Sequence, residues 1–145
     1  MGLDMYLHTR RFDHSGSRFD PESDKRPEHN GWKQSTIEYD VHYWRKFAPL
    51  HHYIVKHFAY EGEDNCQPIE LGVDACEQIA QALRHPDTSF DLDECGGFFF
   101  GNREMWEDDL KVCANESAEA FEKVAKWLRE KEEGFWRSCY YQASW

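Results

Sequence analysis

The sequence predicts an α+β domain, in which a small, mostly antiparallel sheet is packed by about three helices. The prediction depends on alternation of apolar and polar residues at both ends of the chain, which is typical of half-buried strands. It also depends on apolar residues that recur at helical spacing between those ends. A chain of 145 residues fits one domain, which we take to be 1–145. The strand segments are 2–11 and 135–145, and the helical segments are 41–58, 73–85 and 104–131.

The two terminal segments are expected to pair as antiparallel strands. Leu3, Met5 and Leu7 alternate with polar neighbours and give the first strand one buried face. Pairing with the last strand would protect an edge of each. In the last strand, alternation separates two sets of side chains, and either set could pack in the core or stack a flat ligand. One set is Tyr140, Gln142 and Ser144, and the other is Tyr141, Ala143 and Trp145.

The first helix is predicted over 41–58, after a long polar surface loop at 13–36. Val41, Trp44 and Val55 contribute to its apolar stripe, and Asp40 is a candidate N-cap. Pro49 disrupts this pattern because proline breaks a helix interior. The helix therefore either kinks at this proline or begins near residue 47.

The remaining elements are predicted from prolines, glycines and charged residues near their ends. Pro68 restricts a short strand at 66–71 to a sheet edge. Early acids and a late arginine suit the dipole of the helix at 73–85, and Gly134 ends the long helix at 104–131. Segment 86–97 is expected to be a loop, and Gly97–Gly101 a short strand or a tight turn.

Charge limits the classes of partner. The chain has 17 Lys and Arg against 28 Asp and Glu, which gives a net charge of −11. Direct binding to DNA or to an anionic membrane is therefore not expected, because phosphates would repel this chain. Basic protein surfaces, and uncharged or chelating ligands, remain as partners. Runs of acids near residues 61, 91, 107 and 130 either solvate the surface or imitate the phosphates of a nucleic acid.

The sequence contains no secretory signal pattern and no apolar run that could span a membrane. Its five cysteines form an odd set without a CxxC motif, which indicates reduced thiols in a cytosol. Cys76 and Cys113 lie on apolar helix faces and are expected to be buried. No cofactor or metal is expected, since adjacent His51 and His52 point about 100° apart on a helix.

The candidate binding site combines polar residues that packing does not require. We expect Asp4, Arg45 and His51 to meet where the first strand adjoins the first helix. Arg45 would hold an anionic group, and Asp4 would orient Arg45 or His51. The alternative is a structural Asp–Arg pair with the aromatic residues in the core. The expected aromatic walls of the pocket are Tyr6, Trp44, Phe98 and Phe100.

Six segments of the chain carry a resemblance to known proteins: Met1-Gly-Leu-Asp-Met-Tyr-Leu7, Tyr43-Trp-Arg-Lys46, Leu50-His51, Gly62-Glu-Asp-Asn-Cys66, Gly97-Phe-Phe-Phe-Gly101 and Tyr140-Tyr-Gln-Ala-Ser-Trp145. In this order they resemble, from end to end, a family of short proteins of unknown function that tailed bacteriophages and prophages encode. The chain departs from the family at the insertion near 13–36 and at Pro49. A phosphoglycerate-kinase label that some members carry is rejected here, because 145 residues cannot form the two domains that this reaction needs.

This resemblance implies a phage protein that acts in the host cytoplasm. Together with the acidity, it favours a non-catalytic inhibitor of a host defence or nucleic-acid-handling complex, bound to a host protein with a basic surface. The first alternative is a small-ligand binder, such as a sponge for a host signalling nucleotide. The second is a small hydrolase-like enzyme with His51 as general base and Asp4 as its orienting acid.

Overall fold

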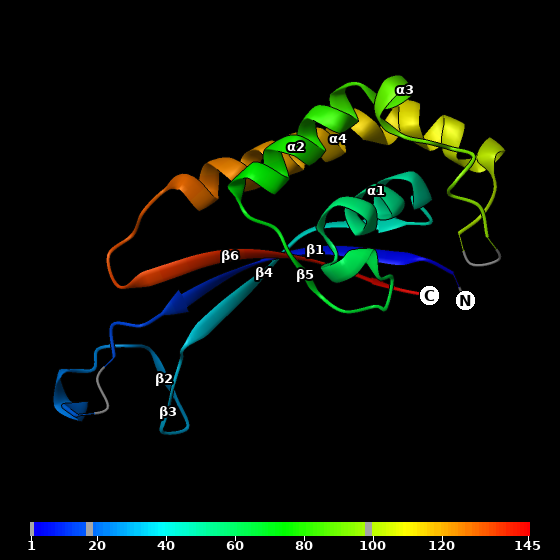
Figure 1. Ribbon diagram of the computed structural model, residues 1–145. Helices are drawn as coiled ribbons and strands as arrows, with labels where there is room; N and C mark the ends of the chain where they lie inside the picture. The colour runs from blue at the N-terminus through cyan, green and yellow to red at the C-terminus, as the bar shows by residue number, and fades with distance from the viewer. Residues whose placement is uncertain (1, 17–18, 98–99) are drawn as a thin grey trace.

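The computed structural model describes residues 2–16, 19–97 and 100–145 (Figure 1). It contains a four-stranded antiparallel sheet in the order β4-β1-β6-β5, so the predicted α+β class is confirmed. A separate two-stranded hairpin extends from one end of the sheet. The strands are β1 Asp4–Asp13, β2 Glu28–His29, β3 Trp32–Lys33, β4 Thr36–Arg45, β5 Ile69–Glu70 and β6 Phe135–Ser144. The helices are α1 Ala48–Phe58, α2 Val73–Arg84, α3 Pro86–Ser89 and α4 Arg103–Arg129, with 3-10 turns at Pro21–Ser23 and Tyr60–Gly62.

The predicted pairing of the terminal strands is confirmed. β1 lies beside β6 over its whole length, from Asp4 opposite Ser144 to Asp13 opposite Phe135. Alternation directs Met5 of β1 and Tyr141 of β6 to the same face, where both are buried. β5 is a short edge strand beside β6, within the segment predicted to form one.

The structure corrects the predicted helix at 41–58. Residues 36–45 form β4, which pairs with β1, and Asp40 lies inside this strand and caps no helix. The register with β1 shifts at a bulge, because Leu7 faces His42 whereas His8 faces Asp40. This extra residue interrupts the alternation of β4, which is why the segment looks helical in the sequence.

Helix α1 begins at Ala48, so the helix starts near residue 47 and does not kink at Pro49. The proline lies in the first turn, where a missing backbone N–H costs nothing. Lys46 has a positive φ of 57°, which ends β4 and turns the chain into the helix. Its backbone N–H donates to the carbonyl of Leu3 at 2.7 Å and ties this turn to the start of the chain.

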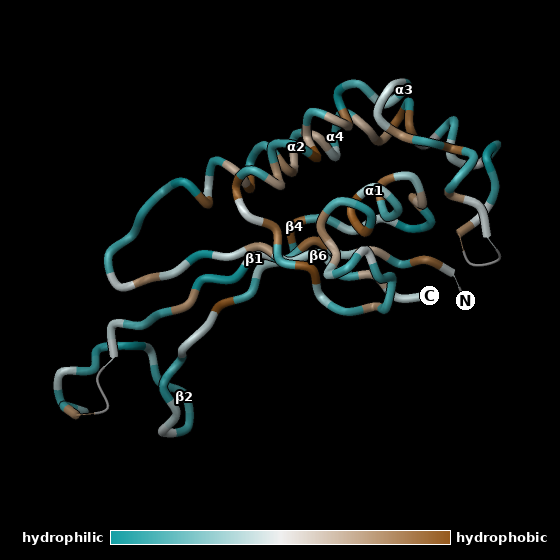
Figure 2. The backbone as a smooth tube through the Cα atoms, in the orientation of Figure 1, coloured by the Kyte–Doolittle hydropathy of each residue, from teal (hydrophilic) through white to brown (hydrophobic). Residues whose placement is uncertain are grey.

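The helices α1, α2 and α4 cover one face of the sheet, and the core lies between the two layers (Figure 1). The predicted helices at 73–85 and 104–131 are confirmed as α2 and α4. Hydrophobic stretches of the chain gather where the helices meet the sheet (Figure 2). Cys76 is buried as predicted, whereas Cys113 is only half-buried. None of the described helices is long and apolar enough to cross a bilayer.

Three loop predictions are refined. Segment 13–36 is largely exposed as expected, but it contains the short β2–β3 hairpin. Segment 86–97 includes the single-turn helix α3. Gly97 and Gly101 form an isolated bridge, and the Gly101 N–H donates to the Gly97 carbonyl at 3.2 Å. The strand or tight turn expected between these glycines falls partly on residues 98 and 99, outside the described residues.

Candidate functional site

The structure does not unite the predicted site residues in one pocket. Asp4, Tyr6 and Arg45 lie on the face of the sheet that no helix covers, with Asp4 opposite Arg45 and Tyr6 opposite Tyr43. His51 lies on the helix side of the sheet, where it bonds to Tyr141. The pocket prediction is therefore wrong in its geometry, because strand alternation directs Asp4 away from the face that α1 covers.

The predicted aromatic walls are also divided between locations. Trp44 is buried in the core, where its ring stacks on Phe121 and its Nε1 donates to Ser117 Oγ at 2.8 Å. Phe100 stacks on His51 with 5.6 Å between ring centroids. Phe98 lies outside the described residues. Trp44 thus has the structural role that was the alternative to ligand contact.

His51 is buried and lies at the centre of a polar network that reaches the surface at Asp64. Its Nε2 lies 2.9 Å from Asp64 Oδ2, and its Nδ1 lies 2.7 Å from the hydroxyl of Tyr141. A carboxylate only accepts hydrogen bonds, so Nε2 donates to Asp64 and Nδ1 accepts from Tyr141. Burial lowers the pKa of His51, with the hydrogen bond to Asp64 opposing that shift, so the neutral ring is favoured.

This network argues against the enzyme hypothesis in its predicted form. Asp64, and not Asp4, orients His51, and both ring nitrogens already have partners. His51 lines a cavity of about 570 Å³ that also contains the thiol of Cys95. Burial raises the pKa of Cys95 to about 11, so the thiol stays protonated near neutral pH and is a poor nucleophile.

We expect His51 to make the stability of the protein depend on pH. In the unfolded chain its pKa is about 6.5, and burial lowers it in the folded state. The unfolded state therefore binds more protons as the pH falls from 6.5 toward the lowered value, and stability is lost in that window. His51→Leu should remove this loss, and at higher pH it should cost about 1–3 kcal/mol because Tyr141 loses its acceptor.

Urea denaturation above and below pH 6.5 measures this effect. Tyr141→Phe is the matched control, because it removes the hydroxyl but keeps the imidazole, so its pH-dependent loss should resemble that of the wild type. An identical loss of stability in wild type and His51→Leu would contradict the expectation.

The uncovered face of the sheet carries a row of aromatic side chains. We call it the open face; Tyr6, His8 and Tyr43 lie toward the end where Asp4 faces Arg45. The Tyr6 ring lies 5.3 Å from that of Tyr43 and 6.0 Å from that of His8, measured between centroids. These three residues and Gln142 line a shallow depression of about 530 Å³. The Tyr43 hydroxyl donates to the carboxylate of Asp4, which raises the pKa of Tyr43.

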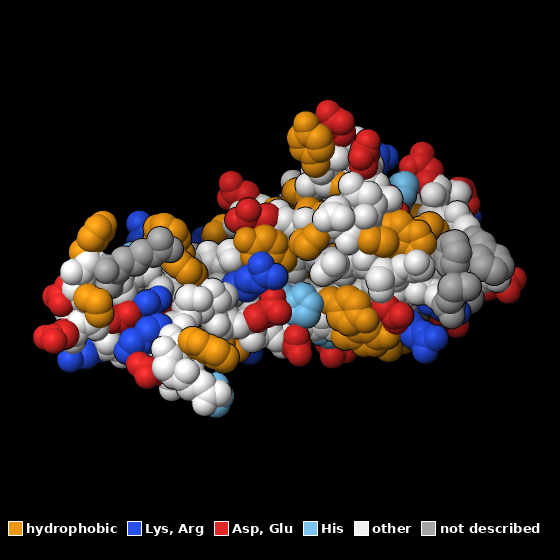
Figure 3. All heavy atoms as spheres, turned by 90° about the horizontal axis from the view of Figure 1, so that it is seen from below, with side chains coloured by type: hydrophobic (Ala, Val, Ile, Leu, Met, Phe, Trp, Pro, Cys, Tyr) orange, Lys and Arg blue, Asp and Glu red, His pale blue; other side chains and the backbone are white. Residues whose placement is uncertain are grey.

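Charged groups of both signs surround these rings. Arg10 lies over the ring of Tyr140 at 4.6 Å, and its Nε donates to Glu38 at 2.7 Å. His8 Nδ1 lies 3.0 Å from Asp40, without the alignment of a hydrogen bond. Seen from below, hydrophobic, cationic, anionic and histidine side chains alternate along this face (Figure 3). Arg45 stands at one end of the row, opposite Asp4.

A second aromatic group lies at the far end of the open face. Phe12 and Trp136 are cross-strand partners with ring centroids 5.7 Å apart, and His14 lies 4.7 Å from the Trp136 ring. Trp136 is 66% exposed, and Tyr43 is 51% exposed at the other end. Contiguous exposed apolar patches often mark interaction sites, and the open face presents an aromatic group at each end.

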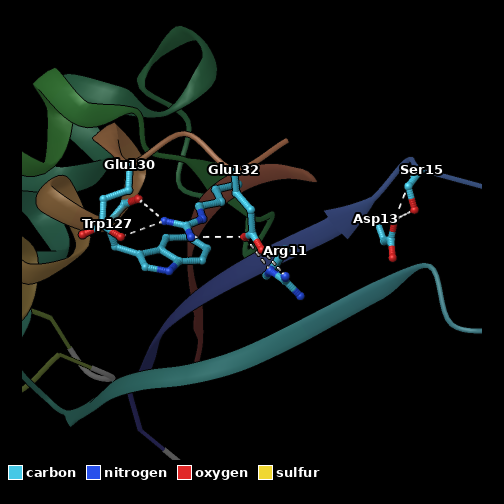
Figure 4. Close-up of polar contacts among 7 residues, drawn as sticks. Arg11, Asp13, Ser15, Trp127, Glu130 and Glu132 are labelled. Carbon is cyan, nitrogen blue, oxygen red and sulfur yellow. Dashed lines mark hydrogen bonds and ion pairs between the residues drawn. The ribbon is translucent and has the colours of Figure 1, made fainter. Parts of the chain in front are cut away.

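The most strongly bonded surface cluster has a structural role. Arg11 and Arg137 are directly opposite on β1 and β6, and the carboxylate of Glu132 accepts hydrogen bonds from both (Figure 4). Arg11 also lies 3.5 Å from the centroid of the Phe135 ring. The two arginines lower the pKa of Glu132 to about 2, so it stays ionised. The cluster fixes the connection between α4 and β6.

Comparisons with known protein families, curated proteins and solved structures find no match. The functional argument therefore depends on the geometry of this chain. Sequence reasoning identified Asp4, Tyr6 and Arg45 but missed Arg10 and Trp136. The available signal was the alternation of the first strand, whose second set of side chains is Asp4, Tyr6, His8, Arg10 and Phe12.

Proposed function

We propose that this protein is a non-catalytic binding protein whose open face docks onto a protein with a basic surface. One observation carries the proposal: an uncovered sheet face presents Tyr43, Trp136 and Arg10 in place of small polar residues. Tyrosine, tryptophan and arginine are the residues most enriched at the energetic centres of protein interfaces. The resemblance to phage proteins supports a host complex as the target, which this binding would inhibit.

The charge of the chain supports a basic partner. A net charge of −11 attracts cationic surfaces over several ångströms and accelerates the encounter. Exposed acids concentrate around α3 and the first turns of α4, where Arg103 and Lys111 are the cations among the described side chains of 86–94 and 103–111. The described acids there are Asp87, Asp91, Asp93, Glu94, Glu104, Glu107 and Asp108.

Capture from a host lysate at increasing salt tests this function. Wild-type protein should retain a host protein, and retention should weaken with salt because charge attraction is screened. A Tyr43→Ala, Trp136→Ala double variant should lose at least about tenfold of that retention, as expected when interface anchors are removed. Trp32→Ala is the matched control, since Trp32 is 73% exposed but lies on the separate β2–β3 hairpin.

Two outcomes would contradict the proposal. One is that no host protein is captured at any salt concentration. The other is equal retention by the wild type and the double variant. The remaining outcome is that only an Asp91→Asn, Asp93→Asn variant loses the captured protein. In that case the acidic surface around α3 and the first turns of α4 is the docking surface, and the open face is not.

A small flat ligand is the second candidate, and the depression lined by Tyr6, His8, Tyr43 and Gln142 favours it. Tyrosine rings can stack a nucleobase, and Arg45 stands nearby for a phosphate. A thermal-shift screen with cyclic and linear nucleotides distinguishes this candidate from protein binding. A nucleotide at 100 times its dissociation constant would stabilise the protein by about 2.7 kcal/mol.

A further inference from the structure

The two edges of the sheet differ in a way that points to self-association. β5, at one edge, is only two residues long. β4, at the other edge, extends for ten residues, and no described strand pairs with its outer side. An unpaired strand of this length presents a row of backbone donors and acceptors to any compatible strand. Proteins usually blunt such an edge with proline, lysine or a bulge. β4 contains neither proline nor lysine, and its bulge lies at one point, near Val41, with strand on either side.

The charges of β4 are complementary to those of a second β4 in antiparallel orientation. Its first half carries Glu38 and Asp40, and its last residue is Arg45, followed by Lys46. Antiparallel pairing of two copies sets the acidic half of each beside the basic end of the other. Glu38 and Asp40 do not repel a second strand, because Glu38 pairs with Arg10 and Asp40 lies beside His8, both on the neighbouring strand β1.

The bulge in β4 selects a register for this pairing. Before the bulge, even-numbered residues such as Glu38 face the open side, and after it odd-numbered residues such as Tyr43 do so. Outside the bulge, two copies keep their side chains on matching faces only if even residues before it pair with odd residues after it. Pairing of Glu38 with Tyr43 of the second copy meets this condition. It also places Ile37 opposite Trp44 of the second copy on the helix side.

An apolar groove beside the edge adds contact area. The groove, of about 520 Å³, lies between β4 and α4 and is lined in part by Tyr39, His42, Val124 and Trp127. In the same register Tyr39, which is 43% exposed, lies opposite His42 of the second copy. The pairing would therefore cover an exposed aromatic ring on each copy.

We propose that β4 pairs with β4 of a second copy in antiparallel orientation, which gives a symmetric dimer with a continuous eight-stranded sheet. The two open faces then form one surface, and Glu38 of each copy lies near Tyr43 and Arg45 of the other. This inference does not depend on what the open face binds.

Sedimentation velocity of the wild-type protein from about 1 μM to about 100 μM tests the proposal. A dimer of moderate affinity has its dissociation constant within this range, so its monomer fraction should fall as the concentration rises. Tyr39→Lys should raise the dimer dissociation constant at least about tenfold, because it places a desolvated charge at the strand edge. Gln67→Lys, in the exposed segment before β5, is the matched control and should leave the dimer unchanged.

Arg45→Glu is a second variant and should also weaken the dimer, since it places a like charge diagonally across from Glu38 of the second copy. Circular dichroism confirms that each variant is folded. Hydrogen exchange of the wild type should show protection of β4 amides that increases with protein concentration. A wild-type protein that is monomeric throughout the range, or a folded pair of variants that dimerise as well as the wild type, would overturn the proposal.

Discussion

Deletion of residues 140–145 is expected to unfold the protein. These residues form half of β6, which lies inside the sheet between β1 and β5. The deletion removes the partners of Asp4 through His8 and the fully buried ring of Tyr141. Each large buried side chain contributes roughly 2–3 kcal/mol. The total stability of a domain is about 5–15 kcal/mol. Losing Tyr141, the partly buried Trp145 and a central hydrogen-bonded ladder together exceeds that margin.

Circular dichroism and a thermal melt measure this result. The matched control is Tyr140→Ser with Gln142→Ser, because both side chains face the open side, and it should keep a cooperative melt. A truncated protein that melts at the wild-type temperature would show that the chain folds without the central strand.

Replacement of Trp44 by alanine is expected to cost about 3–5 kcal/mol, the range for large aromatic side chains deleted from a core. Trp44 joins the sheet to the helices, since its ring stacks on Phe121 of α4 and its Nε1 donates to Ser117. Trp44→Phe separates the two contributions. It keeps an aromatic ring but leaves the buried Ser117 hydroxyl without its donor, which costs about 1–3 kcal/mol.

Urea titration of the three proteins gives these values. Any binding by the open face should survive in Trp44→Phe, because the side chain points to the opposite face. A Trp44→Ala protein of wild-type stability would contradict the place of this ring in the core.

The elements that sequence reasoning predicted correctly have regular patterns. α4 repeats its apolar residues over seven turns, with Trp106, Phe121 and Val124 buried as the spacing requires. The alternation in the terminal strands is shorter, with buried residues at Met5, Leu7 and Thr9 in β1 and at Cys139, Tyr141 and Ala143 in β6. These patterns sufficed to predict the fold class and the pairing of the terminal strands.

β4 was mistaken for a helix for a physical reason. Its bulge near Val41 shifts the alternation by one residue, and Ala48 starts a real helix only three residues after Arg45. The interrupted two-residue repeat of the strand is followed almost at once by the 3.6-residue repeat of the helix. Apolar residues across the junction therefore recur at mixed spacing. Local pattern alone does not reveal where one period ends.

The predicted site was wrong because it combined side chains from opposite faces of the sheet. It combined Tyr6 with Trp44 and Asp4 with His51, although each pair is divided between the two faces of the sheet. Alternation along β1 already places Asp4 and Tyr6 on one face of the sheet and Leu3 and Met5 on the other. The face on which His51 lies depends on how α1 packs against the sheet. Its partner Asp64 lies in the irregular segment after α1, where no periodic pattern predicts the position of a side chain.

The position of β6 also has a consequence for the order of events during synthesis. Every other strand precedes it in the chain, yet β6 separates β1 from β5 in the finished sheet. While the ribosome is still making α4, β1 can pair only with β4, and its second edge stays open. We therefore expect a nascent chain that lacks β6 to expose one edge of β1 to chaperones. The sheet would close only after β6 has been made, in a slow step that joins strands far apart in the sequence.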